Sequence, residues 1–248
     1  MIDAETVVFD HPSGRALHGV GFVVRAGAVV ALTGPSGAGK STLLRCIAAL
    51  DHPTSGRISV AGLDTQDDPR GVHALVGYLP DAFGLYDALS VRQCLAYAAR
   101  ARGVPEAEVE PALARAAEQV GLLGELDWRA GELPPPARTR LALGQAVVHS
   151  PRVLLLDQPL AGLEGYARDA MAALMRRLAL GGVTALISAH ALSELDEICT
   201  DALTLADGRL VDGGVTRLPP KPPKPPPEPP EPEVTEPPPE HPSDGAPA

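Results

Sequence analysis

The sequence predicts an α/β fold in which a parallel sheet is interrupted by a helical insertion. Three short aliphatic runs suit buried parallel strands, and they lie at residues 28–34, 153–157 and 183–188. Stretches with helical periodicity follow at 40–50 and 166–180. Strands that alternate with helices in this way are typical of a parallel sheet.

The insertion separates the first two of these strands and covers roughly residues 85–145. It contains the segments "SVRQCLAYAARARG" and "EAEVEPALARAAEQVGLLG", which we expect to be helical. We therefore predict one folded domain over residues 1–218, with this helical subdomain inside it.

Composition changes sharply at about Leu218. Half of the thirty residues in 219–248 are proline, and few of them have apolar surface to bury. Because proline fixes φ and has no backbone N–H, we expect a disordered tail of extended polyproline II character. The tail is either an acidic spacer or a ligand for a protein that binds Pro-rich motifs.

Bulk properties restrict the class of protein. A formal net charge of −10 argues against a dedicated nucleic-acid binder. The sequence has no apolar stretch of the roughly 20 residues that a spanning helix needs, and its first ten residues do not resemble a secretion signal. The three cysteines are widely spaced and form neither a disulfide framework nor a metal motif. We expect a cytoplasmic protein that lies at the inner face of the cell membrane through a partner.

The segment "GPSGAGKST" satisfies the pattern G-x-x-x-x-G-K-[ST] between a predicted strand and a predicted helix. Its glycines allow successive backbone N–H groups to point at phosphate oxygens, beside the positive end of the helix dipole. Lys40 should reach the β- and γ-phosphates, and the Ser41 hydroxyl should bind Mg²⁺. The expected nucleotide-binding residues of this loop are Gly34, Pro35, Ser36, Gly37, Ala38, Gly39, Lys40, Ser41 and Thr42. The pattern predicts a P-loop NTPase core.

The aliphatic run at 153–157 ends in Asp157, which is well placed to hold Mg²⁺. The next residue is Gln158, where a hydrolase of this pattern usually carries a carboxylate. A carboxylate can take a proton from water, whereas an amide can only orient that water.

The order of the remaining motifs identifies a family resemblance. About 110 residues separate the phosphate loop from "LLLDQP", which is too many for a small GTPase or a simple nucleotide kinase. Residues 76–97 resemble the glutamine-loop region of export-type ATP-binding cassette (ABC) proteins, and residues 133–164 align with the family's signature motif, Walker B strand and D-loop. "ISAH" resembles the segment with the switch histidine, and "DGRLV" resembles the closing hairpin. The likeness covers residues 5–214.

This resemblance implies an N-terminal antiparallel β subdomain and a head-to-tail pair of ATP-binding domains, either a homodimer or a heterodimer. In such a pair each ATP lies between the phosphate loop of one subunit and the signature motif of the other. Separate transmembrane permease subunits are implied as further partners. His11 would stack on adenine, with Phe9 as the alternative. His190 would contact the γ-phosphate, or else cap a helix "ALSELDEI", and Asp157 would hold Mg²⁺ through water.

Three departures from the family pattern fall on residues that perform the chemistry. The first is Gln158. The second is the signature motif, where Pro134–Pro136 replace a serine and two glycines and so remove the hydroxyl and the backbone N–H groups. The third is Asp81 at the glutamine-loop position, with Glu164 ending the D-loop instead of an aspartate.

Every composite ATP site that this chain can form therefore has at least one defect, whether its partner is identical or fully equipped. We expect ATP binding with weak or absent hydrolysis. Two alternatives stay open. One is a pseudo-ATPase module that recruits partners through its Pro-rich tail, and the other is an active ATPase whose base is Asp81 or Glu164.

Overall fold

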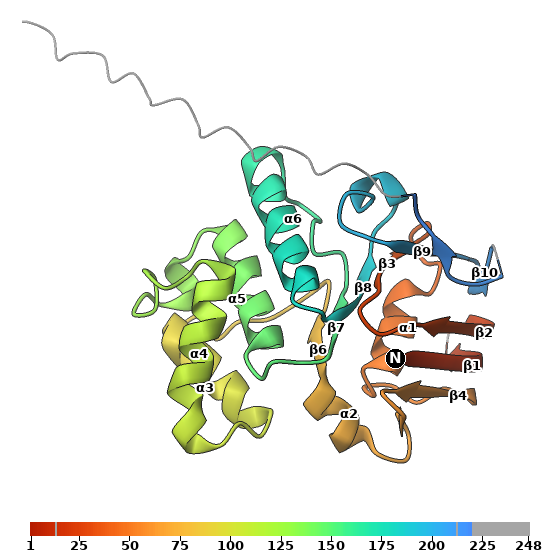
Figure 1. Ribbon diagram of the computed structural model, residues 1–248, viewed down its shortest axis with the longest axis horizontal. Helices are drawn as coiled ribbons and strands as arrows, with labels where there is room; N and C mark the ends of the chain where they lie inside the picture. Colours follow the sequence, from red (N-terminus) through yellow and green to blue (C-terminus); the bar gives the residue numbers. More distant parts are fainter. Residues whose placement is uncertain (13, 212, 220–248) are drawn as a thin grey trace, which may run out of the picture.

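The computed structural model describes residues 1–12, 14–211 and 213–219 (Figure 1). The N-terminal part forms an antiparallel sheet with the strand order β2-β1-β4-β5. Its strands are β1 (Ile2–His11), β2 (Gly14–Val24), β4 (Ser55–Val60) and β5 (Leu63–Asp64). This sheet is the antiparallel subdomain that the family resemblance implies.

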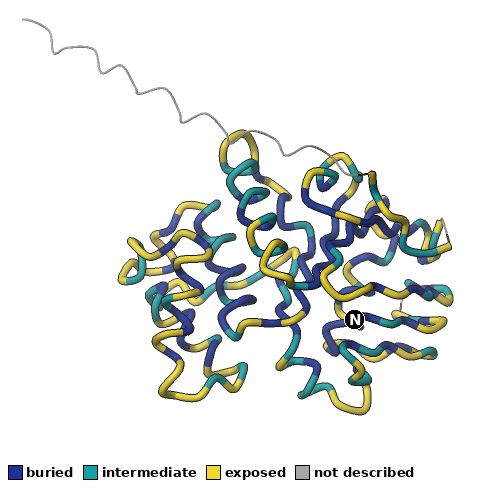
Figure 2. The backbone as a smooth tube through the Cα atoms, in the orientation of Figure 1, coloured by how far each residue is buried: buried dark blue, intermediate teal, exposed yellow. Residues whose placement is uncertain are grey.

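A second, seven-stranded sheet follows the order β10-β9-β3-β8-β7-β6, with β11 also paired to β9. Neighbours from β9 to β6 run parallel. The strands are β3 (Val29–Thr33), β6 (Val76–Leu79), β7 (Val153–Leu156), β8 (Thr184–Ser188), β9 (Asp201–Ala206), β10 (Arg209–Leu210) and β11 (Thr216–Arg217). Every residue of β3, β7 and β8 is buried, and Figure 2 shows these strands at the centre of the molecule. Strands covered on both faces have continuous apolar sequences, which is why they could be predicted. The predicted α/β fold is confirmed.

Helix α1 (Lys40–Ile47) lies between the two sheets. Its Leu43, Leu44 and Ile47 are fully buried and belong to a hydrophobic cluster that includes residues of both sheets. Because α1 begins directly after β3, this packing fixes the position of the segment that joins them.

The helix predicted over 40–50 ends earlier than expected. The N–H of Leu50 donates to the Arg45 carbonyl at 2.9 Å, and Ala49 has a φ of +54°. A left-handed residue with this hydrogen bond closes a helix as in a Schellman motif, usually with glycine at that position. Ala48 and Ala49 are buried, so the apolar periodicity continues past the end of the helix.

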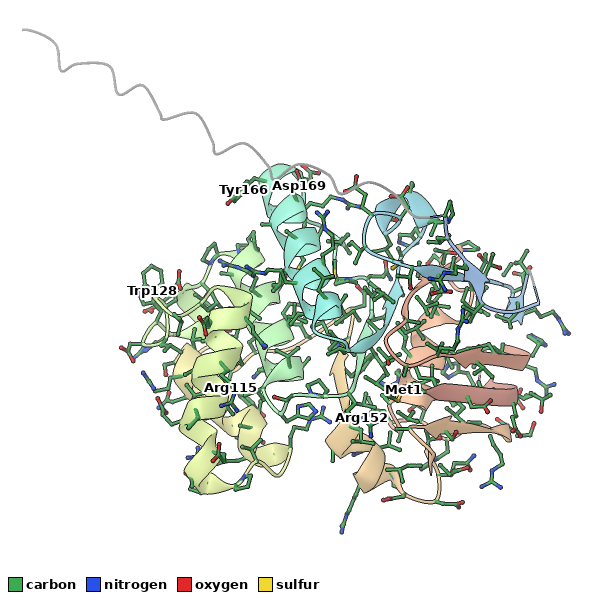
Figure 3. All side chains as sticks on the ribbon, viewed as in Figure 1. Met1, Arg115, Trp128, Arg152, Tyr166 and Asp169 are labelled. Carbon is green, nitrogen blue, oxygen red and sulfur yellow. The ribbon has the colours of Figure 1, made fainter. Side chains whose placement is uncertain are left out.

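The helical lobe consists of α3 (Val91–Ala101), α4 (Glu106–Val120) and α5 (Pro135–Val147), which pack on one another at the left of Figure 1. The short helix α2 (Pro69–Leu75) precedes β6. Buried residues of the lobe form one cluster with β7 and with α6 (Gly165–Leu180). In Figure 3, Trp128 marks the outer edge of this lobe, and Tyr166 marks the beginning of α6.

Within the described residues, no helix combines the length and the apolar character that crossing a membrane requires. The predicted Pro-rich tail, 219–248, lies outside the described residues except for Pro219. The spacer and the ligand for a Pro-rich-motif-binding protein both stay predictions.

Candidate functional site

The phosphate loop, residues 34–39, joins β3 to α1 through three left-handed glycines. Their φ values are +145° at Gly34, +79° at Gly37 and +96° at Gly39. A Cβ at Gly34 would lie 2.1 Å from the Leu205 carbonyl oxygen, and one at Gly39 would lie 2.7 Å from the Ala16 carbonyl oxygen. Side chains are therefore excluded from two of the three positions, which leaves a backbone cradle of the kind that receives phosphate.

Lys40 begins α1, and its side chain folds back under the loop. Nζ donates to the carbonyl oxygens of Gly34 at 2.6 Å and Pro35 at 2.9 Å, and the residue is 5% exposed. Burial lowers the pKa of the Lys40 ammonium, although Asp157 and Glu194 act in the opposite direction. A buried cation held by neutral carbonyls can turn toward an anion that enters the cradle, and this geometry fits a polyphosphate.

Asp157 follows directly after β7 and is 2% exposed. Its Oδ1 accepts a hydrogen bond from the Ser188 hydroxyl at 2.6 Å, and its N–H donates to the Leu79 carbonyl at 2.8 Å. A carboxylate fixed in this way, together with the Ser41 hydroxyl after the loop, is a set of hard oxygen donors that suits Mg²⁺.

Ser188 is a site residue that the sequence reasoning missed. It ends β8, and its Oγ also accepts a hydrogen bond from the Gln158 backbone N–H at 2.8 Å. One hydroxyl therefore fixes the positions of both Asp157 and Gln158. A polar residue at the end of a buried, mostly apolar strand was the available signal.

The side chains of Gln158 and Asp81 meet at the edge of the sheet. Strands β6 and β7 are parallel neighbours with Leu79 opposite Leu156, so both chains leave the sheet at the same edge. Gln158 has a φ of +50°, and its Nε2 donates to Asp81 Oδ2 at 3.3 Å. The structure thus brings together two of the three departures from the family pattern.

His11 lies at the end of β1, beside the first turn of α1. Its Nε2 is 3.4 Å from Thr42 Oγ1, and its ring packs edge-on against Phe9 with centroids 4.8 Å apart. The imidazole is therefore adjacent to the first turn of α1, directly after the phosphate loop.

His190 follows β8, in a turn organised by Glu194. The backbone N–H groups of His190 and Ala191 both donate to Glu194 Oε1, at 3.0 and 2.9 Å, while Arg168 donates to Oε2 at 3.4 Å. Burial alone would raise the pKa of Glu194, but these backbone donors and Arg168 lower it overall. The prediction of a helix "ALSELDEI" is wrong, because Glu194 folds back onto the turn and only a 3₁₀ segment, Leu192–Glu194, forms.

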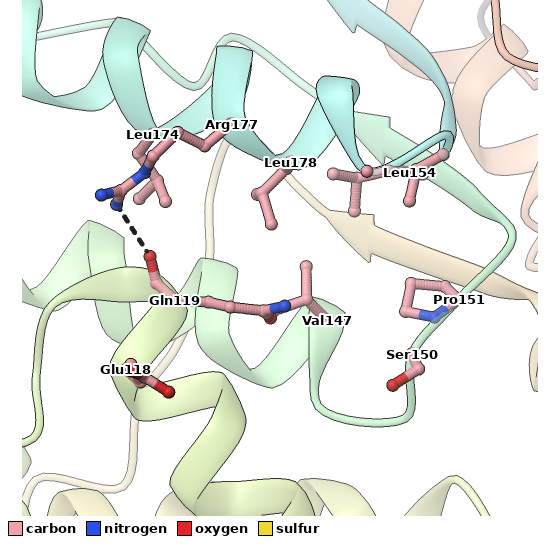
Figure 4. Close-up of a pocket in the computed structure, with 11 residues that line it drawn as sticks. Glu118, Gln119, Val147, Ser150, Pro151, Leu154, Leu174, Arg177 and Leu178 are labelled. Carbon is pink, nitrogen blue, oxygen red and sulfur yellow. Dashed lines mark hydrogen bonds between the residues drawn. The ribbon is translucent and has the colours of Figure 1, made fainter.

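A hollow of about 280 Å³ connects these groups. Its lining includes Gln158, Ser188 and His190, so the segments that follow β7 and β8 face one space. A second hollow of about 530 Å³ lies between α4, α5 and α6 (Figure 4), where Arg177 donates to the Gln119 carbonyl at 3.1 Å. Its lining includes none of the predicted site residues.

Pro134–Pro136 form the first turn of α5. Pro134 is the N-cap, and Pro135 and Pro136 occupy the first two helical positions, where the fixed φ of proline suits a helix. The first N–H of the helix belongs to Ala137 and is already bonded to the Pro134 carbonyl at 2.9 Å. This helix start therefore offers no unpaired N–H group among its first three residues.

Comparisons with known proteins identify the family of this chain. A family model described as "ABC transporter" matches residues 17–161. The chain is 39% identical to the lipoprotein-releasing system ATP-binding protein LolD of Anaeromyxobacter dehalogenans, over 81% of this chain and 87% of that protein. It is 32% identical to the Nod factor export ATP-binding protein I of Burkholderia thailandensis, over 87% of this chain and 71% of that protein.

A solved structure described as the ATP-binding subunit of an ABC transporter superposes with a TM-score of 0.77 and 28% identity, over 88% of this chain and 90% of the other. The family model alone covers more than half of the chain. The chain therefore belongs to the ABC transporter family.

Proposed function

We propose that this chain is an ATP-binding subunit of an ABC transport system and that it binds Mg-ATP in the cradle formed by residues 34–42. The main support is Lys40, whose buried ammonium lies under a loop that excludes side chains at Gly34 and Gly39. Asp157 and Ser41 would hold Mg²⁺, which neutralises phosphate charge when bound. His11 would contact the adenine ring, and His190 would contact the γ-phosphate.

We infer further that hydrolysis is slow. In-line attack on the γ-phosphate needs a water that loses its proton, and a general base contributes about 10²- to 10⁴-fold. Gln158 cannot accept that proton. Pro134–Pro136 have no backbone N–H to donate to a partner's nucleotide. The first N–H of α5, that of Ala137, is already bonded to the Pro134 carbonyl.

Membership of the family supports pairing with a second ATP-binding domain and with separate permease subunits. The two relatives are named as parts of a lipoprotein-releasing system and of Nod factor export, which supports an export-like transporter. In such an assembly the chain would lie at the inner face of the cell membrane.

The permease contact that we propose is the segment after β6. It lines a hollow of about 330 Å³, whose lining includes Phe83, Tyr86 and Tyr97. Tyr86 and Tyr97 are 60% and 56% exposed, and their rings meet edge-on with centroids 5.8 Å apart. Exposed aromatic residues around a hollow are typical of protein interfaces.

Calorimetric titration of the full chain with ATP and Mg²⁺ tests the proposal. The unmodified chain should bind ATP, and Lys40→Met should lose most of that affinity without unfolding. Arg70→Ala, an exposed cation on α2, is the control and should bind normally. Equal ATP affinity in the unmodified chain and in Lys40→Met would contradict the proposed site.

A further inference from the structure

The segment that follows the neighbouring strand supplies a carboxylate beside Gln158. Asp81 comes two residues after β6, as Gln158 comes two residues after β7, and the two side chains are hydrogen-bonded at 3.3 Å. The amide of Gln158 uses a donor that a glutamate would lack, and the acceptor is an acid. The contact therefore pairs two departures from the family pattern, an acid at position 81 and an amide at position 158.

The backbone around this contact is held firmly. The Asp157 N–H donates to the Leu79 carbonyl at 2.8 Å, and the Gln158 N–H donates to the Ser188 hydroxyl at 2.8 Å. These bonds tie the ends of β6, β7 and β8 to one another. Gln158 therefore presents its amide from a fixed position, and its hydrogen bond orients the Asp81 carboxylate.

Other acids near the loop are less suited to accept a proton from water. Asp157 is 2% exposed, and its Oδ1 is bonded to Ser188. Both oxygens of Glu194 accept hydrogen bonds, from two backbone N–H groups and from Arg168. Asp81 is exposed, so solvent can reach its carboxylate.

We propose that Asp81 is the general base for slow ATP hydrolysis and that Gln158 is its positioning residue. This inference rests on the proposed binding of ATP in the cradle. A water attacks the γ-phosphorus, a new P–O bond forms, and the bond to the β-phosphate oxygen breaks. The proton of the water passes to the Asp81 carboxylate, and ADP and inorganic phosphate leave.

The substitution Asp81→Asn separates chemistry from structure. Asparagine keeps an oxygen that can accept the Gln158 hydrogen bond, but it cannot take a proton. Phosphate release from Mg-ATP by the full chain should fall at least about a hundredfold, the lower end of what a general base contributes. ATP affinity and the unfolding temperature should not change. Asp127→Asn, whose side chain is 92% exposed on the helical lobe, is the matched control.

The double variant Asp81→Asn with Gln158→Glu exchanges the two chemical groups across the same contact. It should recover the phosphate release that Asp81→Asn alone loses. The inference is overturned if Asp81→Asn releases phosphate as fast as the unmodified chain, or if the exchanged pair stays as slow as Asp81→Asn.

Two further outcomes are separable. If the unmodified chain binds ATP but releases no phosphate above a protein-free blank, this inference fails while the proposed binding function stands. If titration shows no ATP binding, the proposed function fails, and the assignment of Asp81 fails with it.

Discussion

Replacing Pro134–Pro136 by Ser-Gly-Gly should restore a clamp for a partner's nucleotide. In the present chain the first two helical positions of α5 have no N–H, and the N–H of Ala137 is bonded to the Pro134 carbonyl. The substitution adds three backbone donors and one hydroxyl at the start of this helix. The glycines also remove the rings that prevent close approach of the backbone to phosphate.

The expected effect can be estimated from these donors. A hydrogen bond to a charged group contributes about 1.5–3 kcal/mol. If a single new bond forms in each of the two sites of a symmetric dimer, the gain is roughly 3–6 kcal/mol, or about 10²- to 10⁴-fold in association. Removing three prolines at compatible positions costs about 0.4–1 kcal/mol each, so the monomer should unfold at a lower temperature.

Light scattering during size-exclusion chromatography, with and without Mg-ATP, measures this association directly. Because Gln158 replaces the usual carboxylate, hydrolysis should be slow enough for ATP to stay intact during the run. The same replacement at Pro225–Pro227 in the tail is a control for composition, and it should leave association unchanged. If ATP-dependent dimerisation is equal in the unmodified chain and in the Pro134–Pro136 variant, then the prolines do not disable the clamp.

Four further results are expected. Gly34→Ala should unfold at a lower temperature than Gly37→Ala, because its Cβ would lie 2.1 Å from a carbonyl oxygen while that of Gly37 has no atom within 4 Å; equal melting temperatures would contradict this. His11→Tyr should raise ATP affinity a few-fold in a titration and His11→Ala should lower it, because a larger ring offers more stacking area; unchanged affinities would remove His11 from the adenine site. Ser188→Ala should weaken Mg²⁺-dependent ATP binding, because Asp157 loses its hydrogen bond at 2.6 Å; equal Mg²⁺ dependence would show that Asp157 needs no support. Burial, aided by Arg102, lowers the pKa of His149 to about 4. Between pH 6.5 and about 4 the unfolded chain therefore binds a proton that the folded chain does not, and the free energy of unfolding decreases as the pH is lowered through this range. That loss amounts to roughly 3 kcal/mol at most and should be smaller in His149→Gln when denaturant midpoints are compared at pH 7 and pH 4.5.

The parts of the site that could be predicted from sequence are those fixed by contiguous residues. The phosphate-binding segment, residues 34–42, is nine contiguous residues with its own glycines and lysine, and a periodic strand and helix pattern lies on either side of it. Asp157 could be predicted for the same reason, because a buried strand ends directly before it. The end of α1 could not, since Ala49 adopts a left-handed conformation that alanine seldom takes.

The remaining contacts depend on the register of strands that are distant in sequence. Gln158 and Asp81 are 77 residues apart, and Asp157 and Ser188 are 31 residues apart. Each residue could be singled out as unusual, but the pairing follows from the order β8-β7-β6 in the sheet. Glu194 is a further example of a contact that the sequence did not predict. Its hydrogen bonds to the backbone of His190 and Ala191 form a turn where the sequence predicts a helix.

The contact between Gln158 and Asp81 also makes the two main defects of this chain unequal, namely Gln158 beside its own phosphate loop and Pro134–Pro136 at its signature motif. A base supplied by Asp81 would compensate for Gln158 within the same chain, because Asp81 and Gln158 lie at the same edge of the sheet. No such compensation is proposed for the prolines of α5, because the donors that they lack would have to contact the nucleotide bound by the partner. This chain beside a partner with an intact signature would then hold one working site, while the partner's own phosphate loop would face Pro134–Pro136. Adding such a partner should therefore increase the rate of phosphate release, and Asp81→Asn should abolish the increase. This result would distinguish the asymmetric pair from a homodimer.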